Sequence, residues 1–321
     1  MSKKRIIYRV LVTLTTLFAL LTMVGLLKPF HWSGDLVALV MDYLFGALLL
    51  VLLGFLLLKR WRWATAATLL LVLNGVGLVN YRATASPLSQ DTITVALSEP
   101  TIRLMVYNIY HQNQDLAAVM AEIRKYDPDL LFLMEYSDAI QAQIESELSD
   151  YPHQLIRTSR QTMGLALLSR FPLERTEIHR SNKTRIPVFE AVINVDGNSF
   201  TFVGGHAWPP QPRWGQLHRD QVASIARVAG QIASQSTHPL IVAGDFNASQ
   251  WSYAMQDLSQ QANVANILRP FNLTKTSSPV RLLGLPIDHV LLSDEWVVTA
   301  IEYGDKGGSD HRPIVVDLRF D

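Results

Sequence analysis

The chain has 321 residues with 28 basic and 28 acidic side chains, so its formal net charge is zero. It contains no Cys, which excludes disulfide bonds, thiolate metal sites and a Cys nucleophile. The charges are unevenly distributed along the chain. Residues 1–89 contain nine Lys or Arg and two Asp or Glu, whereas residues 90–321 contain nineteen Lys or Arg and twenty-six Asp or Glu. We therefore expect an apolar N-terminal part of net charge +7 and an acidic globular part of net charge −7.

Three apolar runs, at about 6–27, 36–58 and 64–80, occupy a predicted membrane domain of residues 1–82. At 1.5 Å per residue, helices over the first two runs cross a hydrocarbon core of about 30 Å, and the third does so only barely. Most Lys and Arg residues here lie before the first run or between the second and third. The positive-inside rule then predicts a multi-pass protein of the inner or plasma membrane, with a cytoplasmic N-terminus and a periplasmic or extracellular C-terminal domain.

Two features of this N-terminal part have alternative explanations. The sequence Ala83-Thr84-Ala85 resembles a signal cleavage site, but a linker over residues 83–100, rich in Ser, Thr, Ala and Pro, explains the same residues. A short strand is expected within that linker at 93–97. Asp42 lies about two turns from the outer end of the second run, where helix pairing or contact with the interface is favoured over a function within the membrane.

Residues 101–321 alternate strand-like and helix-like segments, which predicts an α/β domain whose sheets carry helices outside. Strands are expected where β-branched and apolar residues recur, at 102–108, 130–134, 165–168, 188–195, 200–204, 240–243, 289–292, 297–303 and 314–318. Helices are expected over the amphipathic patterns at 116–125, 139–148, 217–234 and 252–262.

Short polar motifs adjoin several of these apolar runs. Asp245 and Asn247 follow one run, Asp288 begins another, and Asp310-His311 precedes the last. Hard oxygen ligands beside an imidazole that titrates near neutral pH are the groups that attack on a phosphoester requires. Taken alone, Asp245 and Asn247 would also fit a turn that caps the following helix.

Together with Tyr107-Asn108-Ile109 and the segment 128–135, these motifs resemble the endonuclease/exonuclease/phosphatase superfamily of DNase I, exonuclease III and sphingomyelinase. The resemblance covers roughly residues 100–321, with agreement in order, spacing and residue type. It implies that residues 101–321 form a catalytic domain with a four-layer α/β/β/α sandwich of the DNase I type. It also implies a metal-dependent hydrolase that acts on phosphoester bonds.

The resemblance assigns catalytic roles to four of the motif residues. Asp245 would orient or deprotonate the attacking water, and Asn247 would hold a phosphate oxygen. His311 would be the catalytic imidazole, and Asp288 would bind its far nitrogen. A carboxylate partner of this kind fixes the imidazole tautomer and favours its cationic form beside an anionic phosphate.

The metal expected from the resemblance is Mg²⁺, with Mn²⁺ or Ca²⁺ as alternatives. Glu135 would be its main ligand, because it ends an apolar strand and because Mg²⁺ typically takes only one or two protein carboxylates. Asn108 and Asp310 would assist. The exonuclease III branch often carries an acid two residues after the Asn, where this chain has Tyr110, so the second protein ligand remains open.

Glu190 and His206 lie on consecutive strand-like runs joined by Asp196-Gly197-Asn198, a hairpin signal. The resemblance implies that both assist in protonating the leaving group or in binding phosphate. A cross-strand polar pair without chemistry is the alternative for these two residues. The loop 206–214, with two Trp and three Pro residues, either forms a wall of the substrate site or packs into the domain.

The favoured function is therefore a membrane-anchored phosphoesterase that cleaves a phosphodiester or phosphomonoester by in-line attack of water. A nuclease acting on DNA or RNA outside the cytoplasm and a phospholipase C-like hydrolase of lipid headgroups are alternatives. The acidic domain lacks the broad basic surface expected of a nonspecific polyanion binder, and membrane attachment favours lipid-linked substrates. A catalytically dead binding domain is disfavoured because the motif residues are all present.

Overall fold

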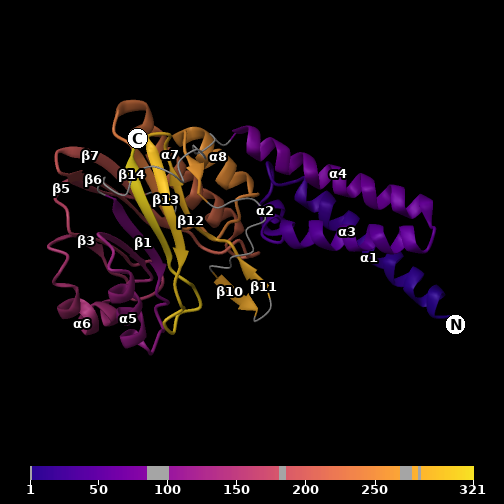
Figure 1. The fold of residues 1–321 in the computed structure, drawn as a ribbon, viewed down its shortest axis with the longest axis horizontal. Coiled ribbons are helices and arrows are strands. Elements are labelled where there is room, and N and C mark those ends of the chain that lie inside the picture. The colour runs from indigo at the N-terminus through magenta and orange to yellow at the C-terminus, as the bar shows by residue number, and fades with distance from the viewer. Residues whose placement is uncertain (1, 85–100, 181–185, 268–276, 281–282) are drawn as a thin grey trace.

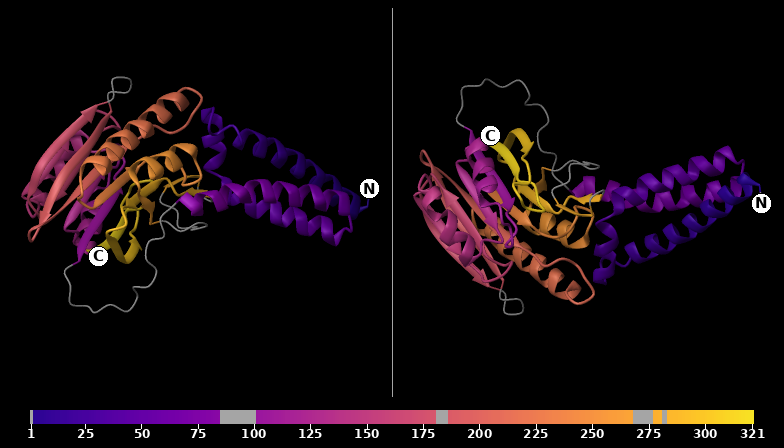
Figure 2. Two further views of the ribbon diagram at one scale, coloured as in Figure 1. Left: turned by 90° about the horizontal axis from the view of Figure 1, so that it is seen from above. Right: turned by 90° about the horizontal axis from the view of Figure 1, so that it is seen from below.

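The computed structural model describes residues 2–84, 101–180, 186–267, 277–280 and 283–321. The N-terminal helices project from one end of an α/β sandwich, and the N-terminus lies at the far end of the helices (Figures 1 and 2). Ala85, the expected strand at 93–97 and most of the expected linker lie outside the described residues.

The N-terminal part contains four helices, α1 (Lys3–Gly25), α2 (Trp32–Ala38), α3 (Met41–Leu57) and α4 (Trp61–Thr84). Within the described residues, α1 is long and apolar enough to cross a membrane. The helices α2 and α3, which are bent by 63° relative to each other, have the length and composition of a second span only when they are taken together. The expectation of three spans is therefore not confirmed. The second expected span is broken between α2 and α3, at a point where polar side chains contact the sandwich.

We define the elbow as residues 28–43, which join α1 to α3 and dock on the sandwich. Asp35, which is 1% exposed, accepts a hydrogen bond of 2.8 Å from the backbone nitrogen of Tyr253 and lies 3.3 Å from the Nε of Arg219. Trp32 packs against Gly215 so closely that an added Cβ there would lie 2.3 Å from its ring. The elbow is thus packed against the sandwich at several points.

The sandwich consists of two mixed sheets, each six-stranded in the described residues. The first has the order β13 (Trp296–Tyr303), β14 (Ile314–Phe320), β1 (Ile102–Asn108), β2 (Leu130–Met134), β4 (Leu165–Ser169) and β3 (His153–Arg157). The second has the order β5 (Leu173–Arg180), β6 (Pro187–Val195), β7 (Asn198–His206), β8 (Leu240–Asp245), β12 (Asp288–Leu292) and β9 (Ala265–Asn266). A separate hairpin pairs β10 (Ser277–Val280) with β11 (Leu283–Leu285).

The core between the sheets is built from alternate residues of the central strands, because successive side chains of a strand point to opposite faces. Phe132 of the first sheet meets Phe202 of the second edge-to-face, with ring centroids 5.2 Å apart. Gly204 permits this approach, since a Cβ at that position would lie 2.6 Å from the Phe132 ring. The strands are apolar on both faces because helices cover the outside of each sheet.

The outer layers are formed by α5 (Leu116–Tyr126) and α6 (Asp138–Ile144) on the first sheet and by α7 (Gly215–Gln235) and α8 (Tyr253–Ala262) on the second. Each of these helices buries one apolar stripe against its sheet. The result is a four-layer arrangement, which confirms the predicted α/β sandwich. The expected strands and helices agree with the observed bounds to within about two residues, except that α6 ends at Ile144 and a 3₁₀ helix, η1 (Glu145–Leu148), covers the rest of the helix expected at 139–148.

Candidate active site

Most of the polar residues singled out in the sequence meet at one edge of the sandwich. Asn108 and Asp245 end β1 and β8, and Glu135 follows β2 directly. Asp288 begins β12, where it lies opposite Asp245 in the antiparallel register, and His311 lies just before β14. Strand ends from both sheets therefore place these side chains around a common point.

Asp245 is the centre of this cluster and is 1% exposed. The Nδ2 of Asn108 donates to Asp245 Oδ2 at 3.0 Å and to Glu135 Oε1 at 3.2 Å, so one amide connects carboxylates carried by the two sheets. The preceding residue, Gly244, has φ of +152°, and a Cβ there would lie 1.9 Å from the carbonyl oxygen of Gly205. Only Gly fits this close approach, which sets the position of Asp245.

His311 lies between two carboxylates. Its Nδ1 is 2.8 Å from Asp288 Oδ2, and its Nε2 is 3.6 Å from Asp245 Oδ2. Burial opposes the charged imidazolium, but the Asp288 and Asp245 carboxylates outweigh burial and raise the pKa of His311 to about 10. His311 is therefore cationic at neutral pH, as a group that stabilises phosphate charge should be.

The pKa of Asp245 is also displaced. Burial, together with the neighbouring Asp288 carboxylate, raises it to about 6, against the opposing effect of His311 and His206. A carboxylate with a pKa near 6 is ionised at neutral pH and is a stronger base than an exposed Asp. This environment suits a group that accepts a proton from water.

His206 and Asn247 complete the rim of the cluster. His206 Nε2 lies 3.6 Å from Asp245 Oδ2, while its Nδ1 is 3.2 Å from the carbonyl oxygen of Thr162. Asn247 has φ of +48° and donates from Nδ2 to the carbonyl oxygen of Ala207 at 2.9 Å. An amide nitrogen carries two hydrogens, so one remains for a phosphate oxygen.

Glu135 has a partner that the sequence motifs did not indicate. Its Oε2 accepts a 2.9 Å hydrogen bond from the backbone nitrogen of His111 and lies 2.7 Å from the Nδ1 of the same residue. Burial alone would raise the pKa of Glu135, but the charge of His206 and the hydrogen bonds from His111 lower it below its usual value. His111 lies three positions after Asn108, and its nearness in sequence to a strand-end ligand is the one available signal.

Ser309, directly before the Asp310-His311 motif, has a role that the sequence did not indicate. Its Oγ donates to the carbonyl oxygen of Asn108 at 2.7 Å and accepts from the backbone nitrogen of His311 at 3.0 Å. This hydroxyl connects the end of β1 to the segment that carries the imidazole.

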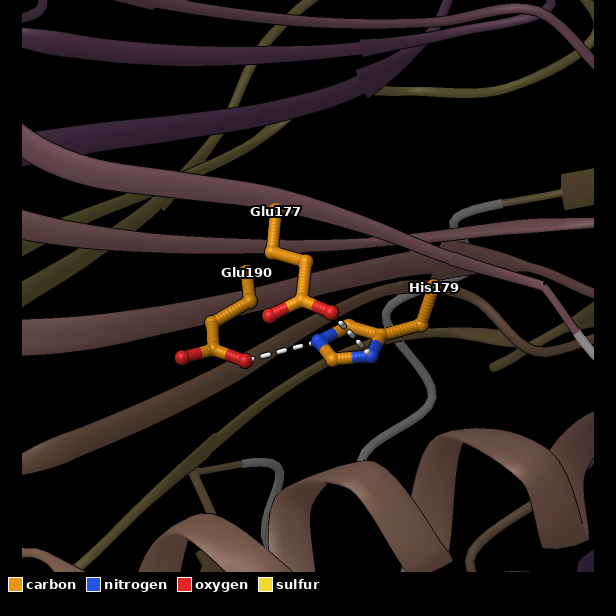
Figure 3. A group of neighbouring side chains, drawn as sticks. All are labelled: Glu177, His179 and Glu190. Carbon is orange, nitrogen blue, oxygen red and sulfur yellow. Dashed lines mark hydrogen bonds and ion pairs between the residues drawn. The ribbon is translucent and has the colours of Figure 1, made fainter.

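Two predicted site residues lie apart from the cluster. Glu190 stands between Phe189 and Ala191, which fill the core between the sheets, so its own side chain points to the opposite face of β6. There it contacts Arg175 and His179 of β5, as Figure 3 shows for His179. The alternation of side chains along the strand thus places Glu190 away from Asp245, which corrects the expectation that it joins the active site.

Asp310 is the second of these residues. It is exposed, and the group held in place is its backbone oxygen, which accepts from Lys306 Nζ at 2.6 Å. Its carboxylate acts on the site at a distance, by contributing to the raised pKa of His311.

In the described structure the cluster therefore includes seven of the nine predicted residues, Asn108, Glu135, His206, Asp245, Asn247, Asp288 and His311.

The loop after His206 packs on itself in part. The rings of Trp208 and Trp214 stack with centroids 5.3 Å apart, and the carbonyl oxygen of Trp208 lies 2.7 Å from the Nδ1 of buried His218. Both Trp residues are half-buried, so they combine packing with an accessible aromatic surface beside the rim.

The donor set of the cluster fits a hard divalent cation. The amide of Asn108 lies between the carboxylates of Glu135 and Asp245, so two negative charges lie close together; its Nδ2 faces both carboxylates, and its Oδ1 accepts from the backbone nitrogen of Tyr110 at 3.1 Å. Mg²⁺ and Mn²⁺ prefer such oxygen ligands and often keep several waters. Glu135 and Asn108 are the residues that would hold the ion, and Glu135 is held in place by His111.

The sequence over residues 105–311 matches the Endonuclease/Exonuclease/phosphatase family. The match covers more than half of the chain, and the chain belongs to this family. None of the curated proteins compared with this sequence matches it.

Solved structures with the same fold have low sequence identity to this chain. The human nocturnin catalytic domain with a bound sulfate anion has a TM-score of 0.57 and 20% identity, over 71% of this chain and 97% of that one. TDP2 of D. rerio complexed with a single strand DNA product has a TM-score of 0.58 and 14% identity, over 69% and 100%. Sphingomyelinase C from Streptomyces griseocarneus has a TM-score of 0.51 and 16% identity, over 68% and 99%. At these identities the likeness establishes the fold alone.

Proposed function

We propose that the chain is a membrane-anchored, metal-dependent phosphoesterase that hydrolyses a phosphodiester or phosphomonoester by in-line attack of water. The observation that carries this proposal is the position of Asp245. It contacts the Asn108–Glu135 pair on one side and lies 3.6 Å from His311, which is bonded to Asp288, on the other. A candidate base, a candidate cation-binding pair and a cationic imidazole thus surround one point.

Each residue can be given a chemical role from its surroundings. Asp245, with its raised pKa, aligns the attacking water and accepts its proton. His311, held cationic by Asp288, donates from Nε2 to the phosphate and stabilises the charge that develops there. A bound Mg²⁺ or Mn²⁺ would supply further charge neutralisation of the phosphate oxygens. Asn247 uses its remaining amide hydrogen to hold a phosphate oxygen, and His206 contacts the same region.

The proposed location is the inner or plasma membrane, with the N-terminus in the cytoplasm and the sandwich in the periplasm or outside the cell. Supporting this, α1 is apolar and mostly exposed, with Leu20 and Met23 more than half accessible. Exposed apolar side chains of this kind are suited to lipid contact. Three spans remain part of the proposal, with α3 as the second and α4 as the third, because α2 belongs to the elbow that docks on the sandwich.

Among substrates, a phosphoester carried by a membrane lipid is favoured over nucleic acid. The elbow contacts two segments that lie close in sequence to site residues, because Ser249 Oγ donates to Ala38 O at 2.7 Å and Tyr43 Oη donates to the carbonyl oxygen of Gly284 in β11 at 2.8 Å. Ser249 is two residues from Asn247, and Gly284 is four residues from Asp288. If the elbow lies at the membrane surface, lipid headgroups are near the cluster. The acidic charge of the sandwich also disfavours a polyanion.

The decisive experiment assays the purified full-length protein in lipid nanodiscs against phosphodiesters, phosphomonoesters, single- and double-stranded nucleic acid and phospholipids. Each assay is run with and without EDTA, and then with Mg²⁺ or Mn²⁺ restored. We expect hydrolysis of at least one phosphoester that EDTA abolishes and the metal restores. The matched control is His311→Ala, which should hydrolyse the same substrate at least about 10²-fold more slowly. Full activity after exhaustive chelation would refute the metal-dependent mechanism, and no hydrolysis of any phosphoester would favour a binding role.

A further inference from the structure

A second group of potential metal ligands lies on the other face of the second sheet. Glu177 and His179 on β5 and Glu190 on β6 point toward α7, into a cavity of about 540 Å³ that residues of α7 also line. Figure 3 shows the imidazole joined by dashed lines to both carboxylates. This cavity is separate from the cluster around Asp245, which lies at the edge of the sandwich between the two sheets.

The backbone brings these three side chains together. Glu177 and Glu190 are direct partners in the antiparallel register, and His179 shares the face of Glu177 because it lies two residues further along the strand. His179 Nε2 lies 2.7 Å from Glu190 Oε2, and its Nδ1 lies 3.4 Å from Glu177 Oε1. One ligand atom from each residue lies within 4.8 Å of the other two.

The charges in this group favour a cation. Like charges directly opposite each other on paired strands are destabilising, and Glu190 is only 5% exposed, so its charge needs compensation. Arg175 binds the Oε1 of Glu190, and the Oε2 of the same carboxylate faces His179. Glu177 contacts His179 but has no guanidinium partner in the described structure. Arg175, Glu177 and Glu190 together carry a net charge of −1.

We propose that Glu177, His179 and Glu190 bind a second divalent cation, of the transition-metal class represented by Zn²⁺. One imidazole nitrogen with two carboxylate oxygens is a donor set that Zn²⁺ accepts, whereas Mg²⁺ prefers oxygen alone. Ligand atoms about 2.0–2.2 Å from a tetrahedral ion lie roughly 3.4 Å apart, so the three side chains, whose ligand atoms now lie within 4.8 Å of one another, would have to move by up to roughly 1.4 Å to enclose it. The cavity provides an entry path and space for a water as the remaining ligand.

The ion would act as a structural clamp. β5 is an edge strand paired only with β6 in its sheet, and Glu177 and His179 belong to β5 whereas Glu190 belongs to β6. A cation shared between them would hold the edge strand in register. Because ligand binding to the native state raises stability, the ion should raise the melting temperature of the sandwich.

The test titrates the full-length, chelator-treated protein with Zn²⁺ by calorimetry and with Co²⁺ by absorption spectroscopy, which reports coordination geometry without any assay of hydrolysis. The catalytic cluster is disabled in all samples by Glu135→Gln, so that binding there is reduced. We expect one further site, weakened at least about tenfold by either His179→Ala or Glu177→Gln, together with a Zn²⁺-dependent rise in melting temperature that these variants lose.

The matched control is Glu174→Gln, because Glu174 lines the same cavity but bonds to Asn194 and Ser199. It should bind Zn²⁺ as the parent does. Glu177 is largely exposed, so Glu177→Gln tests the site even if His179→Ala fails to fold. Unchanged Zn²⁺ and Co²⁺ binding in Glu177→Gln, or no binding by the parent at micromolar metal, would show that the group is an ion-pair cluster only and would overturn the proposal.

Discussion

The indole Nε1 of Trp251 donates a 2.8 Å hydrogen bond to the Oδ1 of Asp42, across 209 positions of sequence. Trp251 belongs to the loop that follows Asn247, and Asp42 lies in the first turn of α3. Asp42 is thus bonded to the sandwich, a partner that was not among those expected for it. Since Lys28 Nζ also donates to the carbonyl oxygen of Trp251 at 3.1 Å, the elbow holds this loop from two sides.

Trp251→Phe should lower both activity and stability, because an aromatic ring is retained but the donor to the half-buried carboxylate of Asp42 is lost. A hydrogen bond to a charged group contributes about 1.5–3 kcal/mol, and the loosened loop should reduce turnover several-fold through Asn247. Turnover and melting temperature of the full-length protein measure the two effects. Trp61→Phe, at a Trp that is 65% exposed, is the control and should change neither. Equal turnover in both variants would show that the elbow does not position the loop.

His311→Ala and Asp245→Asn should each lower turnover by about 10²-fold or more, within the range for losing one acid–base or charge-stabilising group. Both lie at strand ends, so the folded state should survive. His289→Gln is the contrasting variant, because His289 is buried and bonds to Ala248 O and Asn266, each at 2.7 Å. It should reduce the melting temperature while the remaining folded protein keeps most of its turnover. Near-normal turnover in His311→Ala would return this imidazole to a structural role.

The pH dependence of kcat/KM should be bell-shaped. The rate should fall below about pH 6 as Asp245 is protonated and above about pH 10 as His311 loses its proton. In Asp288→Asn the carboxylate that favours the imidazolium is gone, so the pKa of His311 falls and the alkaline limb should move to lower pH. An alkaline limb that stays in place would exclude His311 as the group responsible.

The free energy of unfolding should also depend on the protonation state of His311. Because the pKa of His311 is raised from 6.5 to about 10 on folding, its stabilisation is fully present below pH 6.5 and is lost as pH rises to about 10. The difference in unfolding free energy between the parent and His311→Gln should therefore shrink across that window. A difference that is constant from pH 6.5 to 10 would contradict the charged state assigned to His311.

Glu135→Gln should raise the Mg²⁺ concentration needed for half-maximal activity by at least about tenfold, because the amide removes one of the two negative charges nearest the expected ion. Titration of activity with Mg²⁺ after chelation provides the measurement. Glu147→Gln, at an exposed residue paired with Arg124, should leave the titration unchanged. If Glu135→Gln needs no more Mg²⁺ than the parent, the ion is held elsewhere.

The predicted topology can be checked with a fusion of alkaline phosphatase after Asp321, which should be active if the sandwich faces the periplasm. The reason is the excess of Lys and Arg before the first apolar run and between the second and third. A reporter that works only in the cytoplasm should be silent at the same position. The reverse pattern would refute the orientation.

Sequence periodicity predicted the central strands well because they are buried on both faces and read as unbroken apolar runs. The edge strand β5 was missed, since Arg175, Glu177 and His179 occupy one face of it and its other residues are exposed or only partly buried. The Asp245 and His311 motifs located the site because strand ends at one edge of a sandwich converge. The break near Asp42 could not be read from hydropathy, which contains no information on contacts with Trp251 made after folding.

Glu190 shows a different limit. The resemblance predicted which residue of the chain corresponds to a family site residue, but it did not consider the side of the strand to which that residue points. On β6 the side chains alternate in direction through Phe189, Glu190 and Ala191. Phe189 and Ala191 are apolar and face the core, so Glu190 between them must point to the opposite face of the strand. This alternation alone shows that Glu190 does not belong to the site. His111 had no comparable signal, because its contact with Glu135 depends on how the chain turns after β1.

The docked elbow also bears on how the protein would search for its substrate. A catalytic domain on a loose tether samples a volume, whereas one fixed by Asp35, Asp42 and Trp251 samples a thin layer at constant orientation. If the N-terminal helices lie in a bilayer, encounters become two-dimensional. The rate would then depend on the mole fraction of substrate in the lipid film rather than on its concentration in bulk solution, so dilution with inert lipid would slow the reaction even at fixed total substrate.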